Sequence, residues 1–180
     1  MIKRLAIMTY LLTITMMLST HLNAETKRTP QTQKNELSKL HKARIKTAKG
    51  DILFKFNEKV APKTSLRLKQ LIAKGFYDGI KFHRVVPGFV IQAGDPLGTG
   101  AGGSGQKLKA EFSQEKHVLG TMSMARKGND IHSADSQFYI SLGTHPHLDG
   151  SYTVFGKVIS GIEVAQKISQ GDKIIKMKLE

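Results

Sequence analysis

The chain contains no cysteine, and only 14 of its 180 residues are acidic. Without cysteine, disulfide bonds, thiolate catalysis and cysteine-ligated metals are excluded, so a packed core has to stabilise the fold. The 28 lysines and arginines outnumber the acids and leave a formal net charge of +14. Such a charge favours acidic partners, but no block of five or more basic residues occurs. We therefore expect a solvated basic surface and no specific binding of nucleic acid.

The start of the chain has the pattern of a secretory signal peptide. Two basic residues precede an apolar run over residues 5–18, and Ala24 is a small residue at the expected cleavage point. Because the run is shorter than the ~20 residues that span a bilayer, cleavage is favoured over the alternative of a retained anchor. We expect a signal peptide over residues 1–24, a flexible polar spacer over residues 25–38, and a periplasmic or secreted protein without stable membrane insertion.

Residues 39–180 have the length of one domain. Two segments indicate helices, one that begins near Pro62 and ends before Gly75, and one over residues 162–168. Short β-branched and aromatic runs between turn residues are typical of strands. We expect strands at residues 40–47, 52–56, 80–86, 89–93, 118–124, 137–142, 152–159 and 174–179. The pattern predicts a mainly β domain, either a barrel or an α+β fold.

Three short motifs suggest other chemistries, and each lacks a required part. The glycine-rich residues 98–105 match G-x-G-x-x-G, but no helical periodicity follows to bring a helix N-terminus to a phosphate. His145 and His147 form an H-x-H pair without a third metal ligand nearby. Ser123 does not lie in a G-x-S-x-G nucleophile elbow. We therefore expect a surface loop, and neither a metal site nor a hydrolase.

The most informative stretch is FHRVVPGFVIQAGD at residues 82–95. It places Arg84 inside an apolar, strand-forming run, where a lone arginine ordinarily faces solvent. This run resembles the signature of the cyclophilins. The resemblance continues, in the family's order and spacing, with SMAR at 123–126, SQFYI at 136–140, HLDG at 147–150 and YTVFG at 152–156. It covers about residues 40–179 and is similar to the bacterial single-domain branch of the family.

The resemblance implies a fold and an activity. The implied fold is a closed eight-stranded antiparallel β-barrel capped by two α-helices. The implied activity is that of a peptidyl-prolyl cis/trans isomerase, which rotates X-Pro bonds in proteins and assists folding. The family needs no cofactor and no metal. Its partners are proline-containing polypeptides, and we expect this chain to be a monomer.

The resemblance also implies roles for individual residues. Arg84 matches the catalytic arginine, and Gln92 matches the residue that orients it and contacts substrate. The positions that match the family's substrate groove are Phe89, Val90, Ala125, Arg126, Gln137, Tyr139, His147, Leu148 and Tyr152. The residues that match the hydrophobic lining of the proline pocket are Phe89, Val90, Tyr139 and Leu148. The backbone of Ala125 and Arg126 matches the segment that binds the residue before proline.

Four groove positions differ from the eukaryotic pattern. His147 stands in place of tryptophan, Tyr152 of histidine, Arg126 of asparagine and Val90 of methionine. Because the tryptophan is a drug contact, we expect weak cyclosporin binding.

Two functions of other classes remain as alternatives. One is a module or chaperone that binds proline segments with incidental turnover, and the other is a basic surface-binding protein. The presence of Arg84 favours the enzyme.

Overall fold

The computed structural model describes residues 29–180, so the expected signal peptide lies outside the described part. The chain divides into two units, with the boundary between residues 36 and 37. The second unit carries the sheet and every expected site residue, and it is described by itself. Among the described residues, no helix is long and apolar enough to cross a membrane.

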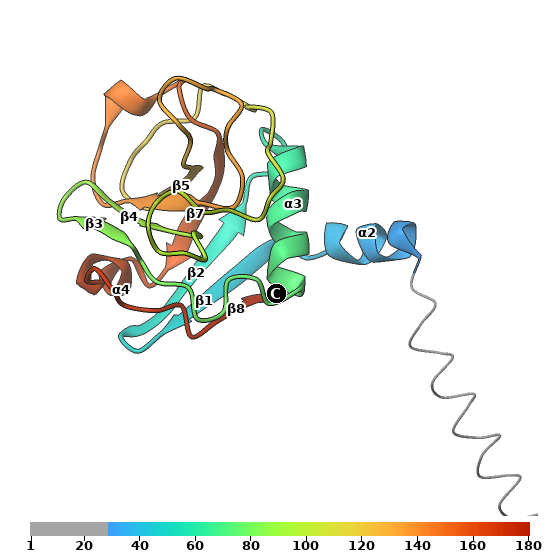
Figure 1. Ribbon diagram of the computed structural model, residues 1–180, viewed down its shortest axis with the longest axis horizontal. Coiled ribbons are helices and arrows are strands. Elements are labelled where there is room, and N and C mark those ends of the chain that lie inside the picture. The colour runs from blue at the N-terminus through green and yellow to red at the C-terminus, as the bar shows by residue number, and fades with distance from the viewer. Residues whose placement is uncertain (1–28) are drawn as a thin grey trace, which may run out of the picture. The chain divides into compact units, whose positions relative to one another are not determined.

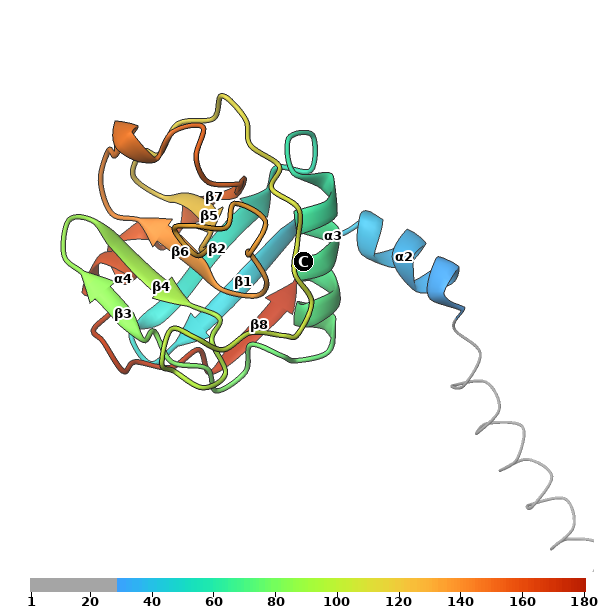
Figure 2. The same ribbon diagram turned by 45° about the horizontal axis from the view of Figure 1, so that its top comes forward.

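Eight antiparallel strands form one curled sheet around the core of this unit (Figures 1 and 2). The strands are β1 (Lys42–Thr47), β2 (Gly50–Phe56), β3 (Arg84–Val86), β4 (Val90–Ala93), β5 (Thr121–Met124), β6 (Phe138–Ser141), β7 (Val154–Ser160) and β8 (Lys176–Leu179). Their order in the sheet is β3-β4-β6-β5-β7-β2-β1-β8. The expected eight-stranded antiparallel architecture is confirmed.

The strand ladder is open rather than closed, because among the described residues no pairing joins its two ends, β3 and β8. Irregular segments that precede these two strands approach each other instead. Gly79 donates its N–H to Ile174 O at 2.7 Å, and Phe82 donates to Asp172 O at 2.8 Å. One isolated bridge, between Lys81 and Lys173, lies in the same region. Two edge strands of three and four residues are too short to extend the ladder across this gap.

Alternation along the strands places the core on the inner face of the sheet. On β1 and β2, residues such as Ile45 and Phe54 are buried while their neighbours are half-buried or exposed, as the two-residue period of a strand requires. Phe54 meets Phe56 and Phe155 edge to face, with ring centroids 5.0 and 6.2 Å apart. This geometry adds favourable quadrupole contacts to the burial of large rings.

Two of the three α-helices in the described part of the chain were expected. Helix α3 (Pro62–Ala73) has proline in its first turn and buries Leu68, Leu71 and Ile72. Helix α4 (Ile162–Lys167) follows Gly161, whose positive φ of 83° suits glycine, and it packs on β2. A short 3₁₀ turn, η1 (Pro146–Leu148), precedes β7.

The third helix, α2 (Pro30–Ser38), lies in the segment expected to be a flexible spacer. Thr29 caps it, because its Oγ1 accepts the N–H of Thr32 at 3.2 Å. The helix has no apolar stripe, so hydrophobic periodicity could not have indicated it. The role of residues 25–38 as a spacer stays a prediction.

Candidate functional site

The site begins with the hairpin of β3 and β4. Pro87 and Gly88 form its turn, in which Gly88 has a positive φ of 72° and Phe89 donates its N–H to Val86 O at 2.9 Å. The register of this hairpin places Arg84 directly opposite Gln92. Directly opposite residues of an antiparallel pair project from the same face. The local sequence therefore brings the two expected catalytic side chains together.

A chain of amides fixes the orientation of Gln92. Its Nε2 donates to Gln137 Oε1 at 2.9 Å, and Gln137 Nε2 donates to the carbonyls of Gly100 and Gly102 at 2.9 and 2.8 Å. These bonds leave Gln92 Oε1 facing Arg84 Nη1 at a long 3.5 Å. The glycine loop thus positions the arginine indirectly, through two glutamines.

The guanidinium of Arg84 keeps most of its donors free. Besides the long contact to Gln92, it lies over the ring of Phe89, with Cζ 5.5 Å from the ring centroid. The side chain is exposed at the mouth of a cavity of about 210 Å³. A guanidinium carries five N–H donors in a planar fork. Arg84 therefore presents donors to whatever enters the cavity.

The cavity is apolar below this arginine. Val90, Tyr139 and Leu148 form a buried cluster separate from the main core, and Phe89, Ala125 and Tyr152 pack against it. This cluster lies on the outer side of the sheet, because the inward side chains of β4 and β6 belong to the main core. The cavity is lined by Arg84, Phe89, Val90, Gln92, Ala125, Arg126, Tyr139, Leu148 and Tyr152. Its size and lining suit one apolar ring.

Arg126 also lines the cavity, and carbonyl groups hold its guanidinium. Its Nε donates to Ser151 O at 3.0 Å, and its Nη1 donates to Lys127 O and Gly128 O at 2.9 and 3.1 Å. Its Cζ lies 4.7 Å from the ring centroid of Tyr152. Arg126 therefore fixes Tyr152 and the following loop and has few donors left for a ligand.

Like Gln137, His147 is an expected groove residue that does not line the cavity. Its exposed ring stacks on Phe89 from outside, with centroids 5.8 Å apart. His145 lies within hydrogen-bond distance of the same residue, with Nε2 2.9 Å from Phe89 O. His145 and His147 thus both contact Phe89 and support its position. Among the described residues, no group of three or more potential metal ligands occurs.

Sequence reasoning missed a buried histidine beneath the pocket. His117 is 1% exposed, and its Nε2 lies 3.0 Å from both Tyr139 Oη and Ser123 Oγ. Its Nδ1 lies 3.1 Å from Asp149 Oδ1, which also accepts the His117 N–H at 2.8 Å. Since a carboxylate only accepts, Nδ1 carries the proton and Nε2 accepts from a hydroxyl. His117 therefore ties Tyr139 to the residue that follows Leu148.

Burial lowers the pKa of His117, while the hydrogen bond to Asp149 opposes that shift. The imidazole is therefore neutral under ordinary conditions. Ser123, His117 and Asp149 have the atom order of a hydrolase triad. Ser123 is fully buried, however, so no substrate carbonyl reaches its hydroxyl. No single-residue signal identifies His117, because its partners lie 6, 22 and 32 residues away.

The glycine loop surrounds a carboxylate rather than a phosphate. Buried Asp95 accepts the N–H groups of Leu97, Thr99 and Gly100 at 2.8, 2.9 and 2.5 Å. Burial alone would raise the pKa of Asp95, but these bonds outweigh it and lower the pKa. The amides that a nucleotide would need are already used, so the surface-loop interpretation fits the structure.

Comparison with known proteins agrees with this geometry. The model of the family described as cyclophilin type peptidyl-prolyl cis-trans isomerase/CLD matches residues 42–178. A peptidyl-prolyl cis-trans isomerase of Helicobacter pylori (strain ATCC 700392 / 26695) is 44% identical over 151 residues, which cover 82% of this chain and 91% of the relative. Peptidyl-prolyl cis-trans isomerase B of Bacillus subtilis (strain 168) is 45% identical over 131 residues, 72% of this chain and 90% of the relative.

Solved structures agree as well. A cyclophilin of Cryptosporidium parvum superposes with a TM-score of 0.74 at 32% identity, covering 78% of this chain and 98% of that one. A second structure of that protein, determined in the presence of the dipeptide Ala-Pro, has a TM-score of 0.73 at 31% identity. The fold is that of a cyclophilin. The chain belongs to the cyclophilin-type peptidyl-prolyl cis/trans isomerase family and is an enzyme of that class.

Proposed function

We propose that Arg84 carries the catalytic step, by donating an N–H to the prolyl nitrogen in the twisted state of an X-Pro bond. The barrier to rotation is about 18–20 kcal/mol, because the nitrogen lone pair is conjugated with the carbonyl. In the twisted state that lone pair is free to accept a hydrogen bond. A donor that gains a partner only in this state lowers the barrier without tightening the ground state.

The observation that carries this proposal is that the N–H donors around the cavity are not equally engaged in hydrogen bonds. Arg84 makes one long hydrogen bond to Gln92, which is itself held by Gln137. The guanidinium is therefore oriented at the cavity, and most of its N–H groups remain available to a ligand. The apolar floor takes the proline ring, with Phe89 and Leu148 at its sides. Burying the ring beside Arg84 also excludes water, which strengthens the charged hydrogen bond.

The residue before proline binds along Ala125 and Arg126 in this proposal. The Ala125 N–H already donates to Gln137 O at 2.9 Å, which leaves other backbone groups of this segment for the substrate. Gln137 and Tyr152 border the same path. The partners are proline-containing polypeptides, bound by a monomer, and cyclosporin binds weakly because His147 offers a smaller apolar face than an indole.

A variant that keeps the charge tests the role of the planar donor. Arg84→Lys should lose most of the isomerase activity, because an ammonium on a flexible stem does not reproduce the guanidinium fork. The measurement is a protease-coupled assay on a short X-Pro peptide, with circular dichroism as the folding control. Near wild-type activity of Arg84→Lys would favour the alternative of a proline-binding module in which this side chain supplies only positive charge.

The proposed site of action is the periplasm or the cell exterior. It is supported by the basic start, the apolar run of residues 5–18 and the small Ala24. Intact mass of the protein isolated from the cell envelope should lack about the first 24 residues. A full-length mass in the membrane pellet would instead indicate a retained anchor.

A further inference from the structure

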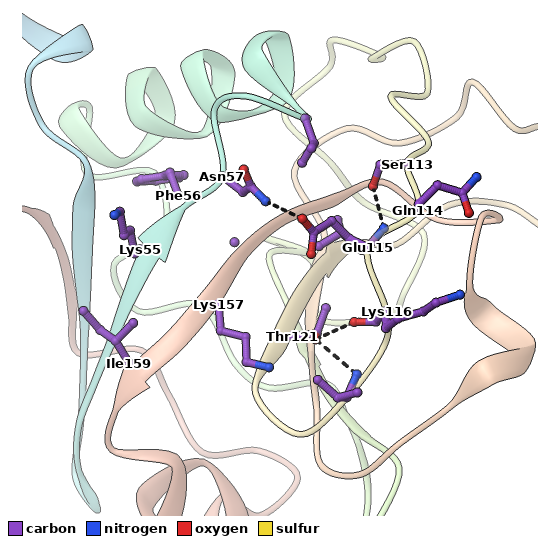
Figure 3. A pocket seen from close by; sticks show the side chains of 14 residues that line it. Lys55, Phe56, Asn57, Ser113, Gln114, Glu115, Lys116, Thr121, Lys157 and Ile159 are labelled. Atoms are coloured by element: carbon purple, nitrogen blue, oxygen red, sulfur yellow. Dashed lines mark hydrogen bonds between the residues drawn. The ribbon is translucent and has the colours of Figure 1, made fainter.

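A second cavity, of about 610 Å³, lies away from the proline pocket (Figure 3). Its walls are the outer faces of β2, β5 and β7 and the facing segment 113–118. Figure 3 shows Lys55, Lys157 and Ile159 coming from the strands and Glu115 and Lys116 from the segment. We call this cavity the lysine groove. None of its lining residues lines the proline pocket.

The sheet holds like charges directly opposite each other at this groove. Lys55 on β2 is paired with Lys157 on β7, and on its other side with Lys42 on β1. All three side chains are exposed, and none has an ion pair within 4 Å among the described residues. Like charges directly opposite across strands are destabilising. Such a row is stabilised when an anionic ligand lies over it.

The groove combines this charge with apolar surface. Half-buried Val60 and Val118 contribute to its walls, and Ile159 is 48% exposed at its rim. Glu115 supplies one negative charge and accepts a hydrogen bond from Asn57 Nδ2 at 3.1 Å. Lys116 forms an ion pair with Asp149, with Nζ 3.3 Å from Oδ2. The unpaired groups are therefore Lys55 and Lys157, beside an apolar rim.

The segment 113–118 separates the lysine groove from the catalytic site. Lys116 and Val118 face the groove, whereas His117 between them points to Tyr139 of the proline pocket. Neighbouring residues of this segment therefore line the groove and contact the lining of the proline pocket.

We propose that the lysine groove is a second binding site for the polypeptide substrate and takes a segment with acidic residues beside an apolar one. This proposal rests on the proposed function, since it assumes a polypeptide in the proline pocket. A peptide fits better than a membrane because the site is concave, and better than a nucleic acid because the one aromatic residue in its lining, Phe56, is only 4% exposed.

Binding of a proline-free peptide of alternating glutamate and leucine tests the groove without involving catalysis. Lys55→Glu/Lys157→Glu should weaken binding to the full chain about tenfold or more, because each lysine becomes a repulsive charge. Lys74→Glu/Lys173→Glu is the matched control, since it changes the net charge equally at exposed lysines outside the groove. This control should change affinity less than about twofold. Equal weakening in both variants, or no binding to the wild type, would overturn the proposal.

A kinetic comparison separates this proposal from the proposed function. The wild type should isomerise a neutral X-Pro tetrapeptide as fast as Lys55→Gln/Lys157→Gln does, and only the wild type should show a KM lowered about fivefold by an added acidic segment. Failure to isomerise the neutral peptide would contradict the proposed function and leave the proline-free binding result standing. Loss of phosphatidylglycerol-vesicle or single-stranded-oligonucleotide binding in the glutamate variant, without any peptide binding, would overturn the peptide assignment.

Discussion

Two arginines line the same cavity, and their guanidinium groups differ in how many hydrogen bonds they already make. Each lies over an aromatic ring, Arg126 over Tyr152 and Arg84 over Phe89, but Arg126 donates to three carbonyls, whereas Arg84 makes one hydrogen bond, of 3.5 Å. A guanidinium whose donors are already hydrogen-bonded stabilises the wall of the site. A guanidinium that is oriented at the cavity but has free N–H groups can donate to the prolyl nitrogen when twisting of the X-Pro bond frees the lone pair of that nitrogen. Both arginines line the cavity, so their hydrogen bonds, rather than their position, distinguish Arg126 from the arginine that we propose to be catalytic.

The largest expected effect is the difference between Arg84→Ala and Arg126→Ala. Loss of Arg84 should lower kcat on the order of a hundredfold or more, if a preorganised donor is worth about 2.7–4 kcal/mol. Loss of Arg126 should lower kcat/KM about tenfold or less, because it loosens Tyr152 without removing the donor to the prolyl nitrogen. Steady-state kinetics on one X-Pro peptide measures both. Equal losses would remove the distinction between the two arginines.

The next effect tests the positioning role of Gln92. Gln92→Ala should lower kcat about tenfold, since the bond to a charged group is worth about 1.5 kcal/mol. The Arg84 Nε–H resonance should broaden or shift, because the guanidinium loses its partner. Gln137→Ala should reproduce the shift more weakly, because it acts on Arg84 only through Gln92. An unchanged Arg84 resonance in both variants would show that the amide chain does not orient the arginine.

A smaller effect concerns the buried His117. His117→Leu should raise KM severalfold, because the buried Tyr139 hydroxyl loses its hydrogen-bond partner at a cost of about 1–3 kcal/mol. Asp149 loses its bond to the imidazole in the same variant. His117→Gln keeps polar atoms at this place and should recover part of the loss. If both variants bind peptide as the wild type does, His117 does not position the pocket.

His117 also predicts a pH dependence of stability. Burial lowers its pKa in the folded protein below the ordinary value of 6.5, although Asp149 opposes the shift and His145 and His147 add to it. The unfolded chain therefore binds more protons below about pH 6.5, and the free energy of unfolding falls as the pH drops through that value. His83 shifts in the same direction. The melting temperature of His117→Gln should thus depend less on pH between 8 and 5 than that of the wild type, but not be flat.

The smallest effect belongs to His147. Its ring lies outside the cavity and stacks on Phe89, so His147→Trp should change peptide turnover less than about twofold. The same variant should bind cyclosporin more tightly, because an indole adds apolar area. A titration that shows nanomolar inhibition of the wild type would contradict the expected weak binding.

The sequence predicted the type and order of the strands because alternation and turn residues are local signals. It overestimated the length of several, such as 80–86, where the chain forms a strand only from Arg84. Before that point, Gly79 and Phe82 bond to an irregular segment near the C-terminus, and local patterns do not record such partners. Likewise, no pattern around Pro30 indicated a helix without an apolar face.

The candidate site was predictable where one motif carries it. Arg84, Phe89 and Gln92 belong to a single hairpin, so their resemblance to a family signature also fixed their proximity. His117 was missed because its role depends on contacts to Tyr139 and Asp149 that only the folded sheet creates. The free donors of Arg84 and the hydrogen-bonded donors of Arg126 likewise depend on tertiary contacts.

Exchange spectroscopy at saturating peptide tests the central claim most directly, because it observes rotation of the bound X-Pro bond separately from binding. For a folded Arg84→Ala protein, we expect a dissociation constant within about threefold of the wild type and an exchange rate lowered on the order of a hundredfold. An exchange rate near that of the wild type would contradict the account. A loss confined to binding would also contradict it, because Arg84 would then act on the ground state.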